Sequence, residues 1–200
     1  MTSKNEKNSY RRVVTGHENG KSIIQSDERL EAYRFKAVPG FEHTLLWGNY
    51  GIPDLSREQK PGRYPQSLIP GPGGSTLHIV TYPPDRVSQL ALDPAAAVKE
   101  FAERLPGLSD SFEREDPGMH RTNTVDYAVV LEGEIWLETD RGKTIHLKRG
   151  DTVIQNGTRH AWRNKGQENA TMLYVILGAK ISSGNLTVGM GNPGRRLEPQ

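Results

Sequence analysis

Short runs in which hydrophobic and polar residues alternate recur along most of the chain. Residues 11–38 contain RRVV, KSIIQ and AYRFKAV, separated by Gly, Asn, Asp and Glu. Residues 124–180 contain six more: VDYAVVLEG, EIWLETD, KTIHLKRGD, TVIQNG, RHAWRN and TMLYVILGAK. Short strands at regular intervals, broken by turn residues, are typical of an antiparallel sandwich or barrel. The pattern therefore predicts an all-β fold.

One segment shows the spacing of a helix instead. Its apolar residues recur at intervals of three and four: Ala97, Val98, Phe101, Ala102 and Leu105. Asp93 can cap this segment, and Pro94 suits the first helical position. We expect one short helix over residues 94–105.

Two segments rich in Pro and Gly interrupt the pattern. Residues 51–74 hold too many of both for a regular element, and we expect a long loop that acts as a lid. Residues 181–200 form a second such stretch. We therefore expect one domain in three parts: N-terminal strands and a loop packed on the barrel over 1–75, a barrel over 76–180, and a tail over 181–200.

Length, charge and residue usage restrict the function classes. A chain of 200 residues suits one well-buried domain with extensions, since about 150 residues is a usual domain size. The 26 Lys and Arg nearly balance the 24 Asp and Glu, so neither nucleic acid nor a membrane is an expected partner. The absence of Cys excludes disulfides and thiolate chemistry. The polar start and the lack of a long apolar run predict a soluble cytoplasmic protein.

The six histidines differ in the environment predicted for them: His17, His43, His78, His120, His146 and His160. His17 lies in a turn-like segment and is expected in solvent. Strand alternation places His146 opposite its apolar neighbours, so it is expected outside the barrel. His43 fits either environment. His78 fits a pocket acid or base, or a surface residue.

His120 and His160 each stand at a strand start next to a turn, with hairpins between them. On an antiparallel barrel, two such positions can meet at one mouth. Residues 120, 122, 124 and 126 share one face of a regular strand. Two imidazoles with Asp126 would make the two-histidine, one-carboxylate set that binds Fe(II) and related ions.

Each of these residues also has a purely structural interpretation, which the spacing alone favours. Strand-end histidines are often held by a backbone carbonyl, and Asp126 could be a turn or capping carboxylate. Trp136 and Trp162 are more commonly core or rim aromatics than substrate platforms.

The stretch from His120 to Lys180 resembles the conserved barrel of the cupin superfamily, whose motifs are written G(x)5HxH(x)3-4E(x)6G and G(x)5PxG(x)2H(x)3N. His120 matches the first histidine, Asp126 stands at the acidic position, and Gly133 follows at the expected spacing. The second motif is matched by Gly150, Gly157, His160 and Asn164. The resemblance covers about a third of the chain. It implies a double-stranded β-helix, or jelly-roll barrel, with an N-terminal strand extension.

The departures from these motifs fall on the metal ligands. Thr122 replaces the second histidine and Asp126 replaces the glutamate; the first glycine is Arg114, and the proline is absent. The resemblance implies a divalent metal (Fe, Mn, Ni or Zn) on His120, Asp126 and His160. Thr is a poor ligand beside imidazole, and Asp is shorter than Glu, so affinity should fall. His78 is the candidate for a compensating ligand.

The resemblance implies a small-molecule enzyme with non-oxidative chemistry: decarboxylation, dehydration or isomerisation. The expected catalytic residues are His78, His120, Asp126, Tyr127 and His160, and the expected substrate-binding residues are Thr122, Trp136 and Trp162. The histidines would act as metal ligands, or as acid and base with Asp126 orienting one of them. Residues 51–74 would cover the mouth and exclude water.

Two alternatives remain open. One is a metal-dependent dioxygenase, in which His120, Asp126 and His160 leave coordination positions for substrate and oxygen. The other is a barrel that binds a small ligand without turning it over. A DNA-binding regulator is disfavoured by the absence of a helix-turn-helix pattern. The resemblance also implies a homodimer formed through the strands of residues 11–37.

Overall fold

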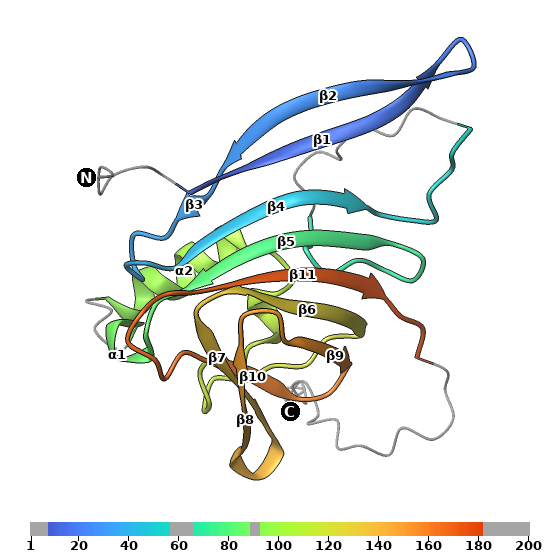
Figure 1. Ribbon diagram of the computed structural model, residues 1–200. Coiled ribbons are helices and arrows are strands. Elements are labelled where there is room, and N and C mark those ends of the chain that lie inside the picture. The colour runs from blue at the N-terminus through green and yellow to red at the C-terminus, as the bar shows by residue number, and fades with distance from the viewer. Residues whose placement is uncertain (1–7, 57–65, 89–92, 182–200) are drawn as a thin grey trace, which may run out of the picture.

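The computed structural model describes residues 8–56, 66–88 and 93–181. Figure 1 shows a series of arched strands lying side by side, with a smaller group of strands packed beneath them. The described strands form one six-stranded, one three-stranded and one two-stranded sheet. Every pairing within them is antiparallel.

The six-stranded sheet provides one wall of the barrel. Its strands lie in the order β3 (Tyr33–Arg34), β4 (Glu42–Asn49), β5 (Ser75–Tyr82), β11 (Ala170–Gly178), β6 (Thr124–Glu132) and β9 (Thr152–Asn156). In β6 the even-numbered residues from Thr124 to Val130 are buried, and the residues between them are half-buried or exposed. The register places Tyr174 beside His78 on one side and Ala128 on the other. Side chains from distant parts of the sequence therefore share the inner face.

The three-stranded sheet forms the opposite wall, in the order β10 (His160–Arg163), β7 (Glu134–Thr139) and β8 (Lys143–Lys148). The short 3-10 turn η2 (Asp140–Gly142) joins β7 to β8. The core between the walls consists of Val80, Ala128, Val130, Ile135, Leu137, Leu147, Ala170, Met172, Tyr174 and Ile176. Burying each large apolar side chain contributes about 1.5–3 kcal/mol.

The motif glycine Gly133 is required by the turn between β6 and β7. Its φ is +72°, and a Cβ at this position would lie 2.5 Å from the carbonyl oxygen of Asn169. Any larger residue would therefore combine backbone strain with a clash against the chain that leads into β11.

The N-terminal hairpin stands apart from the barrel. In the described part of the chain, strands β1 (Ser9–Glu18) and β2 (Lys21–Glu31) pair only with each other. They are joined at Asn19 and Gly20, whose positive φ values of 50° and 75° suit a tight hairpin turn. Figure 1 shows this hairpin as an arm that projects beyond the end of β4.

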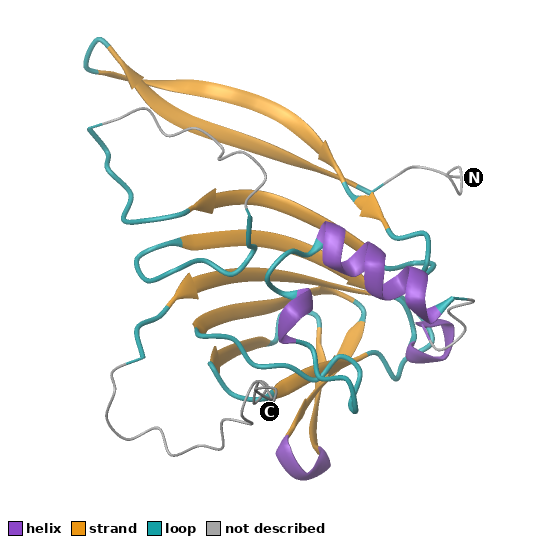
Figure 2. Ribbon diagram, turned by 180° about the vertical axis from the view of Figure 1, so that it is seen from behind, coloured by secondary structure: helices purple, strands orange, loops and turns teal. Residues whose placement is uncertain are grey.

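Three short helical elements follow β5: α1 (Asp85–Ser88), α2 (Pro94–Arg104) and the 3-10 turn η1 (Ser109–Ser111). Asp93 caps α2 as predicted, because its side chain accepts hydrogen bonds from the Ala95 and Ala96 amides at 2.9 and 3.0 Å. Figure 2 shows α2 lying across the sheet near the base of the hairpin.

Helix α2 packs with only part of its predicted apolar set. Ala97 and Phe101 contact a second core cluster made of Phe35, Val38, Leu68 and Leu105. Val98 is 72 % exposed, and Ala102 is also exposed. The helix ends at Arg104, so Leu105 reaches the cluster from the cap position. The predicted set of apolar residues covers a wider face of the helix than the structure buries, because a short helix packed on a sheet buries a single narrow face.

The all-β prediction is confirmed, and so is the placement of the main helix. Of the predicted lid, residues 57–65 lie outside the described residues, whereas Leu68 is fully buried and its amide donates to the Pro106 carbonyl at 2.8 Å. Strands β3 and β4 are continuous with the barrel sheet, although the division of the chain at residues 75 and 180 stays a prediction. No helix in the described ranges has the length and apolarity to cross a membrane.

Candidate active site at the end of the barrel

His120 and His160 lie directly opposite each other, as their sequence positions predicted. Each backbone amide donates to the other residue's carbonyl oxygen at 2.9 Å, forming an isolated β-bridge. The two imidazole rings lie 4.3 Å apart between centroids. Both residues are buried, with exposed fractions of 9 % and 2 %.

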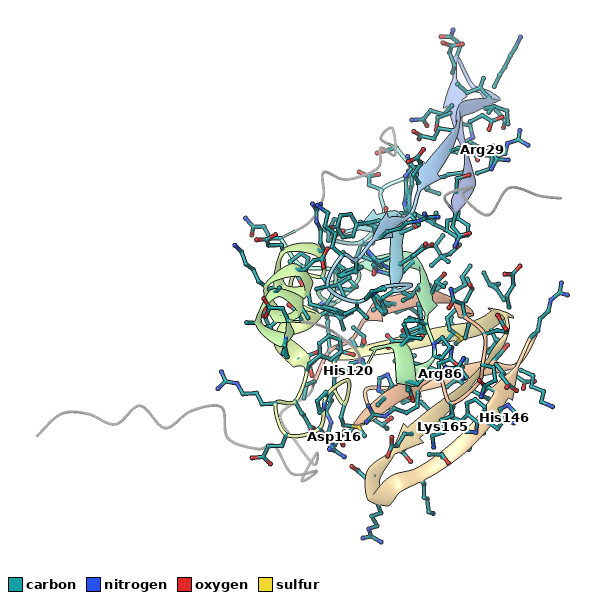
Figure 3. The ribbon with its side chains drawn as sticks, turned by 90° about the vertical axis from the view of Figure 1, so that its left-hand side faces the viewer. Arg29, Arg86, Asp116, His120, His146 and Lys165 are labelled. Atoms are coloured by element: carbon teal, nitrogen blue, oxygen red, sulfur yellow. The ribbon has the colours of Figure 1, made fainter. Side chains whose placement is uncertain are left out.

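The loop that leads to His120 is held against β10 by ion pairs. Arg159 contacts both carboxylate oxygens of Glu113 at 2.6 Å, and Arg163 contacts Asp116 at 2.7 Å. Figure 3 shows Asp116 on this loop close to His120. These ion pairs lie outside the barrel and hold the loop that carries His120 next to His160.

Backbone carbonyls set the tautomer of both rings. Nδ1 of His120 lies 2.9 Å from the Gly118 oxygen, and Nδ1 of His160 lies 3.0 Å from the Thr158 oxygen. A carbonyl can only accept, so each Nδ1 carries a hydrogen, and Nε2 of each neutral ring is left with a lone pair. This arrangement prepares an imidazole to bind a donor or a metal through Nε2.

Burial keeps both imidazoles neutral. It lowers the pKa of His160 to about 4, with further lowering from His120. It also lowers the pKa of His120, against opposing effects of the Gly118 carbonyl and Glu113. At neutral pH the pair therefore presents two hydrogen-bond acceptors and no positive charge.

Asp126 projects from β6 onto the inner face of the barrel. Its Oδ1 is buried and has no hydrogen-bond partner. Burial raises its pKa to about 6, and a hydrogen bond from the Thr124 hydroxyl opposes this rise. The hydroxyl oxygens of Thr122 and Thr124 lie 2.7 Å apart. Thr122, which replaces the motif histidine, is therefore hydrogen-bonded to Thr124, the next residue of the strand on the inner face.

Aromatic side chains surround this cluster. Phe112 meets the His120 ring edge-on at 5.1 Å, and Trp162 meets His160 in the same way at 5.9 Å. Trp162 also contacts Tyr174 at 5.7 Å, and the Tyr174 hydroxyl lies 2.9 Å from that of Tyr82. Sequence reasoning missed this tyrosine pair, because its members lie 92 positions apart and meet only through sheet pairing.

A second histidine pair lies deeper in the same sheet. His43 Nε2 is 2.9 Å from His78 Nδ1, and His78 Nε2 is 2.7 Å from the Thr76 hydroxyl, which donates to the Leu68 carbonyl at 3.1 Å. Because Thr76 uses its hydrogen on Leu68, it must accept from His78, and His78 must in turn accept from His43. His78 is thus a hydrogen-bonded buried residue rather than a surface residue, and its pKa lies well below the usual value because of burial and of His43.

Two predicted pocket residues lie on the outside. Tyr127 is 42 % exposed, because it follows Asp126 on a regular strand and must face the other way. Trp136 alternates with the buried Ile135 and stacks on His146 at 4.1 Å on the outer face. The structure therefore does not bring either side chain to the inner face with Asp126. The predicted outside position of His146 is confirmed.

The predicted metal centre is not assembled. Among the described residues, no three or more His, Asp or Glu side chains are grouped closely enough to hold a metal ion. Thr122 has a hydroxyl, hydrogen-bonded to that of Thr124, where the motif has an imidazole. The Asp126 carboxylate is not close enough to both histidines for the three side chains to bind one metal ion. The ligand set of His120, Asp126 and His160 therefore does not fit a metal in this arrangement.

Comparison with known proteins agrees with the fold and the motif. The family described as "Cupin domain" (Cupin_2) matches residues 113–176. Oryzines biosynthesis cluster protein J of Aspergillus oryzae is 39 % identical over 104 residues, which cover 52 % of this chain and 51 % of that protein. Phomopsin biosynthesis cluster protein C' of Diaporthe leptostromiformis is 51 % identical over 63 residues, covering 31 % and 33 %.

A third relative is named for a reaction class. The cupin-domain-containing oxidoreductase virC of Hypocrea virens is 35 % identical over 65 residues, covering 31 % of this chain and 34 % of that protein. The chain thus matches about half of the length of the first relative and about a third of the other two. Residues 113–176 therefore carry a cupin domain, and the antiparallel barrel and the paired motif histidines agree with this match.

Proposed function

We propose that this protein catalyses proton transfer on a small carbonyl compound inside its barrel, with Asp126 as the general base. The observation that carries the proposal is the state of this carboxylate. One of its oxygens is buried without a partner, and burial raises its pKa to about 6. Buried structural carboxylates are normally hydrogen-bonded, so an unsatisfied carboxylate whose pKa lies near neutrality favours a catalytic role.

His120 and His160 bind and orient the substrate. Each offers an Nε2 lone pair, because each Nδ1 is committed to a backbone carbonyl. Two neighbouring acceptors select a ligand with hydroxyl or amino hydrogens. The substrate class is therefore a carbonyl compound with such donors near the carbonyl group.

The reaction begins when ionised Asp126 removes a proton from the carbon beside the substrate carbonyl. The electrons of the broken C–H bond pass into an enolate. Return of the proton to a neighbouring position completes an isomerisation; loss of a β-hydroxyl, with that proton, as water completes a dehydration. General-base catalysis of this kind is most effective when the pKa of the base lies near the working pH.

The tyrosine pair can stabilise the enolate. Tyr82 and Tyr174 carry two hydroxyl hydrogens, and their contact at 2.9 Å uses one of them. The other is left to donate to a developing oxyanion, an interaction that is strong in a buried site. The pKa of Tyr174 lies well above its usual value because of burial, so the hydroxyl keeps its proton.

The test is deuterium incorporation in heavy water, followed by mass spectrometry over a broad panel of small hydroxy- and amino-carbonyl compounds. We expect the wild-type protein to exchange at least one compound at an acidic carbon, and Asp126→Asn to slow that exchange at least 100-fold. The matched control is Tyr127→Phe, which changes the outward neighbour and should leave exchange unaltered. Wild-type exchange that persists in Asp126→Asn, or no exchange with any compound, would contradict the proposal.

The name of the virC relative supports a second candidate, an oxidoreductase. It is distinguished by substrate-dependent oxygen uptake, measured with an oxygen electrode. Uptake that is lost in His120→Gln, without any deuterium exchange, would favour this candidate over the first.

A further inference from the structure

Strand β4 has an open edge that faces the hairpin. On this side β3 pairs with β4 only at Glu42 and His43. Between Thr44 and Asn49, no other strand of the described chain pairs with it there. The backbone groups of an antiparallel strand alternate between its two sides, so this edge offers N–H and C=O groups to an added strand.

Two cavities line this edge, with volumes of about 350 and 430 Å³. Arg12, Leu46 and Trp47 border both of them, and we name the two adjoining cavities together the hairpin groove. Neither cavity is lined by His120 or His160. Figure 3 shows Arg29 on the hairpin, well separated from His120 in the body of the molecule.

The side chain of Arg12 contacts this edge at Leu46 and Trp47. Its Nη1 donates to the Leu46 carbonyl at 2.6 Å, and its guanidinium lies 5.6 Å from the centre of the Trp47 ring. Its Nε is buried without a hydrogen-bond partner. A buried donor without an acceptor is costly, and an incoming carbonyl or carboxylate oxygen would satisfy it.

The charge of the groove selects an acidic occupant. Arg29 and Arg104 line the first cavity together with Arg12, which also pairs with Glu28, and Glu31 is the acidic residue among the described lining residues. Arg29 donates to Ser9 Oγ at 3.1 Å and also interacts electrostatically with Asp27. Guanidinium groups bind carboxylates in a paired geometry, so this lining complements Asp or Glu side chains.

We propose that the hairpin groove binds an extended acidic peptide, which adds to β4 as a further strand. Main-chain hydrogen bonds to the open edge would give affinity, and the arginines would select the side chains. A second copy of the hairpin is a poorer occupant, because its Asp27 and Glu28 are already paired with Arg11 and Arg12. This site is distinct from the barrel site and does not depend on the proposed reaction.

The experiment selects nine-residue peptides from a random phage library on the full chain and measures their affinity by fluorescence anisotropy. We expect enriched sequences with alternating β-branched and acidic residues. The Arg29→Gln variant should weaken their binding at least fivefold, and Arg12→Gln with Arg29→Gln at least tenfold. The matched control, Arg149→Gln, removes an exposed arginine elsewhere and should leave affinity unchanged.

A peptide-side test keeps the protein unaltered. Two versions of a selected peptide are made, one methylated at the odd-numbered backbone nitrogens and one at the even-numbered ones. One version should lose binding and the other should keep it, because only one set of amides faces β4. Equal binding of both versions, or enrichment that is independent of the arginines, would overturn the proposal. A second pair of results would also overturn the proposal. If no peptide is selected, and light scattering shows a dimer that the double substitution dissociates, then a second copy of the chain fills the groove.

Discussion

Single side chains on the inner face determine what the barrel can do chemically. Asp126 and the two motif histidines all have pKa values shifted towards neutral forms, and burial is the main cause in each case. Strand alternation predicted that residues 120, 122, 124 and 126 would share one face, and all four are buried. The same rule, applied to the next residue, would have excluded Tyr127. What sequence could not supply was ring orientation, which depends on carbonyls in two separate turns.

Asp126 should reduce stability at neutral pH. Its folded-state pKa of about 6 exceeds the ordinary carboxyl value, so its favourable contribution is complete below about pH 4 and is lost as pH rises through 6. Asp126→Asn should therefore be more stable than wild type by about 2–3 kcal/mol at pH 8, with little difference at pH 4. Urea unfolding at both pH values measures this. A variant that is less stable at pH 8 would show that the carboxylate is held by a group other than those described.

The buried histidines should make the protein sensitive to acid. The pKa values of His43 and His160 are lowered to about 4 by burial, so their stabilising contribution is complete above pH 6.5 and is lost as pH falls towards 4. We expect the free energy of unfolding to fall by several kcal/mol between pH 7 and pH 4.5. His43→Asn should flatten this dependence, whereas His17→Asn, at an exposed position, should preserve it.

At the scale of elements, local pattern predicted the strands and the helix, but not their partners. The helix cap at Asp93 needed only neighbouring residues, so it was predictable. The role of Glu100 was not, because its carboxylate accepts from the Tyr33 hydroxyl and from the Lys36 and Ala37 amides at 2.8–2.9 Å, more than sixty positions away. This one side chain joins α2 to the segment that follows β3.

Replacing Glu100 should loosen α2. Glu100→Ala leaves two backbone amides without their acceptor, which costs about 1–3 kcal/mol. Glu103→Ala, on the exposed side of the same helix, should change the free energy of unfolding by less than about 0.5 kcal/mol. Chemical denaturation of both variants measures the difference. Equal effects would mean that the Glu100 contacts contribute no net stability.

At the scale of the whole molecule, stability is divided unevenly between barrel and hairpin. The barrel sheets share one core, whereas β1 and β2 form backbone strand pairs only with each other among the described strands. Sequence patterns predicted strands in both regions equally well. They could not show that the first two leave the barrel sheet, because strand order depends on contacts between residues far apart in the chain.

The hairpin should therefore open before the barrel does. Isolated two-stranded hairpins are marginally stable. Native-state hydrogen exchange should give amides of β1 and β2 a lower opening free energy than those of β11, which has partners on both sides. A peptide bound in the hairpin groove should raise protection in β1, whereas Arg29→Gln should remove that gain. Uniform exchange across hairpin and barrel would indicate one cooperative unit.

The hydrogen bonds from His43 through His78 and Thr76 to Leu68 all run the same way, each residue donating to the next. The histidine pair can therefore take up one proton without losing a hydrogen bond, but not two. A proton added at Nδ1 of His43 leaves every bond in the chain intact, because Nε2 still donates to His78. A second proton would have to enter at His78 Nδ1, where two donors would then face each other and the link would break. The side-chain link between β4 and β5 should therefore persist through the first protonation and break at the second, whereas the bonds from His78 through Thr76 to Leu68 stay intact.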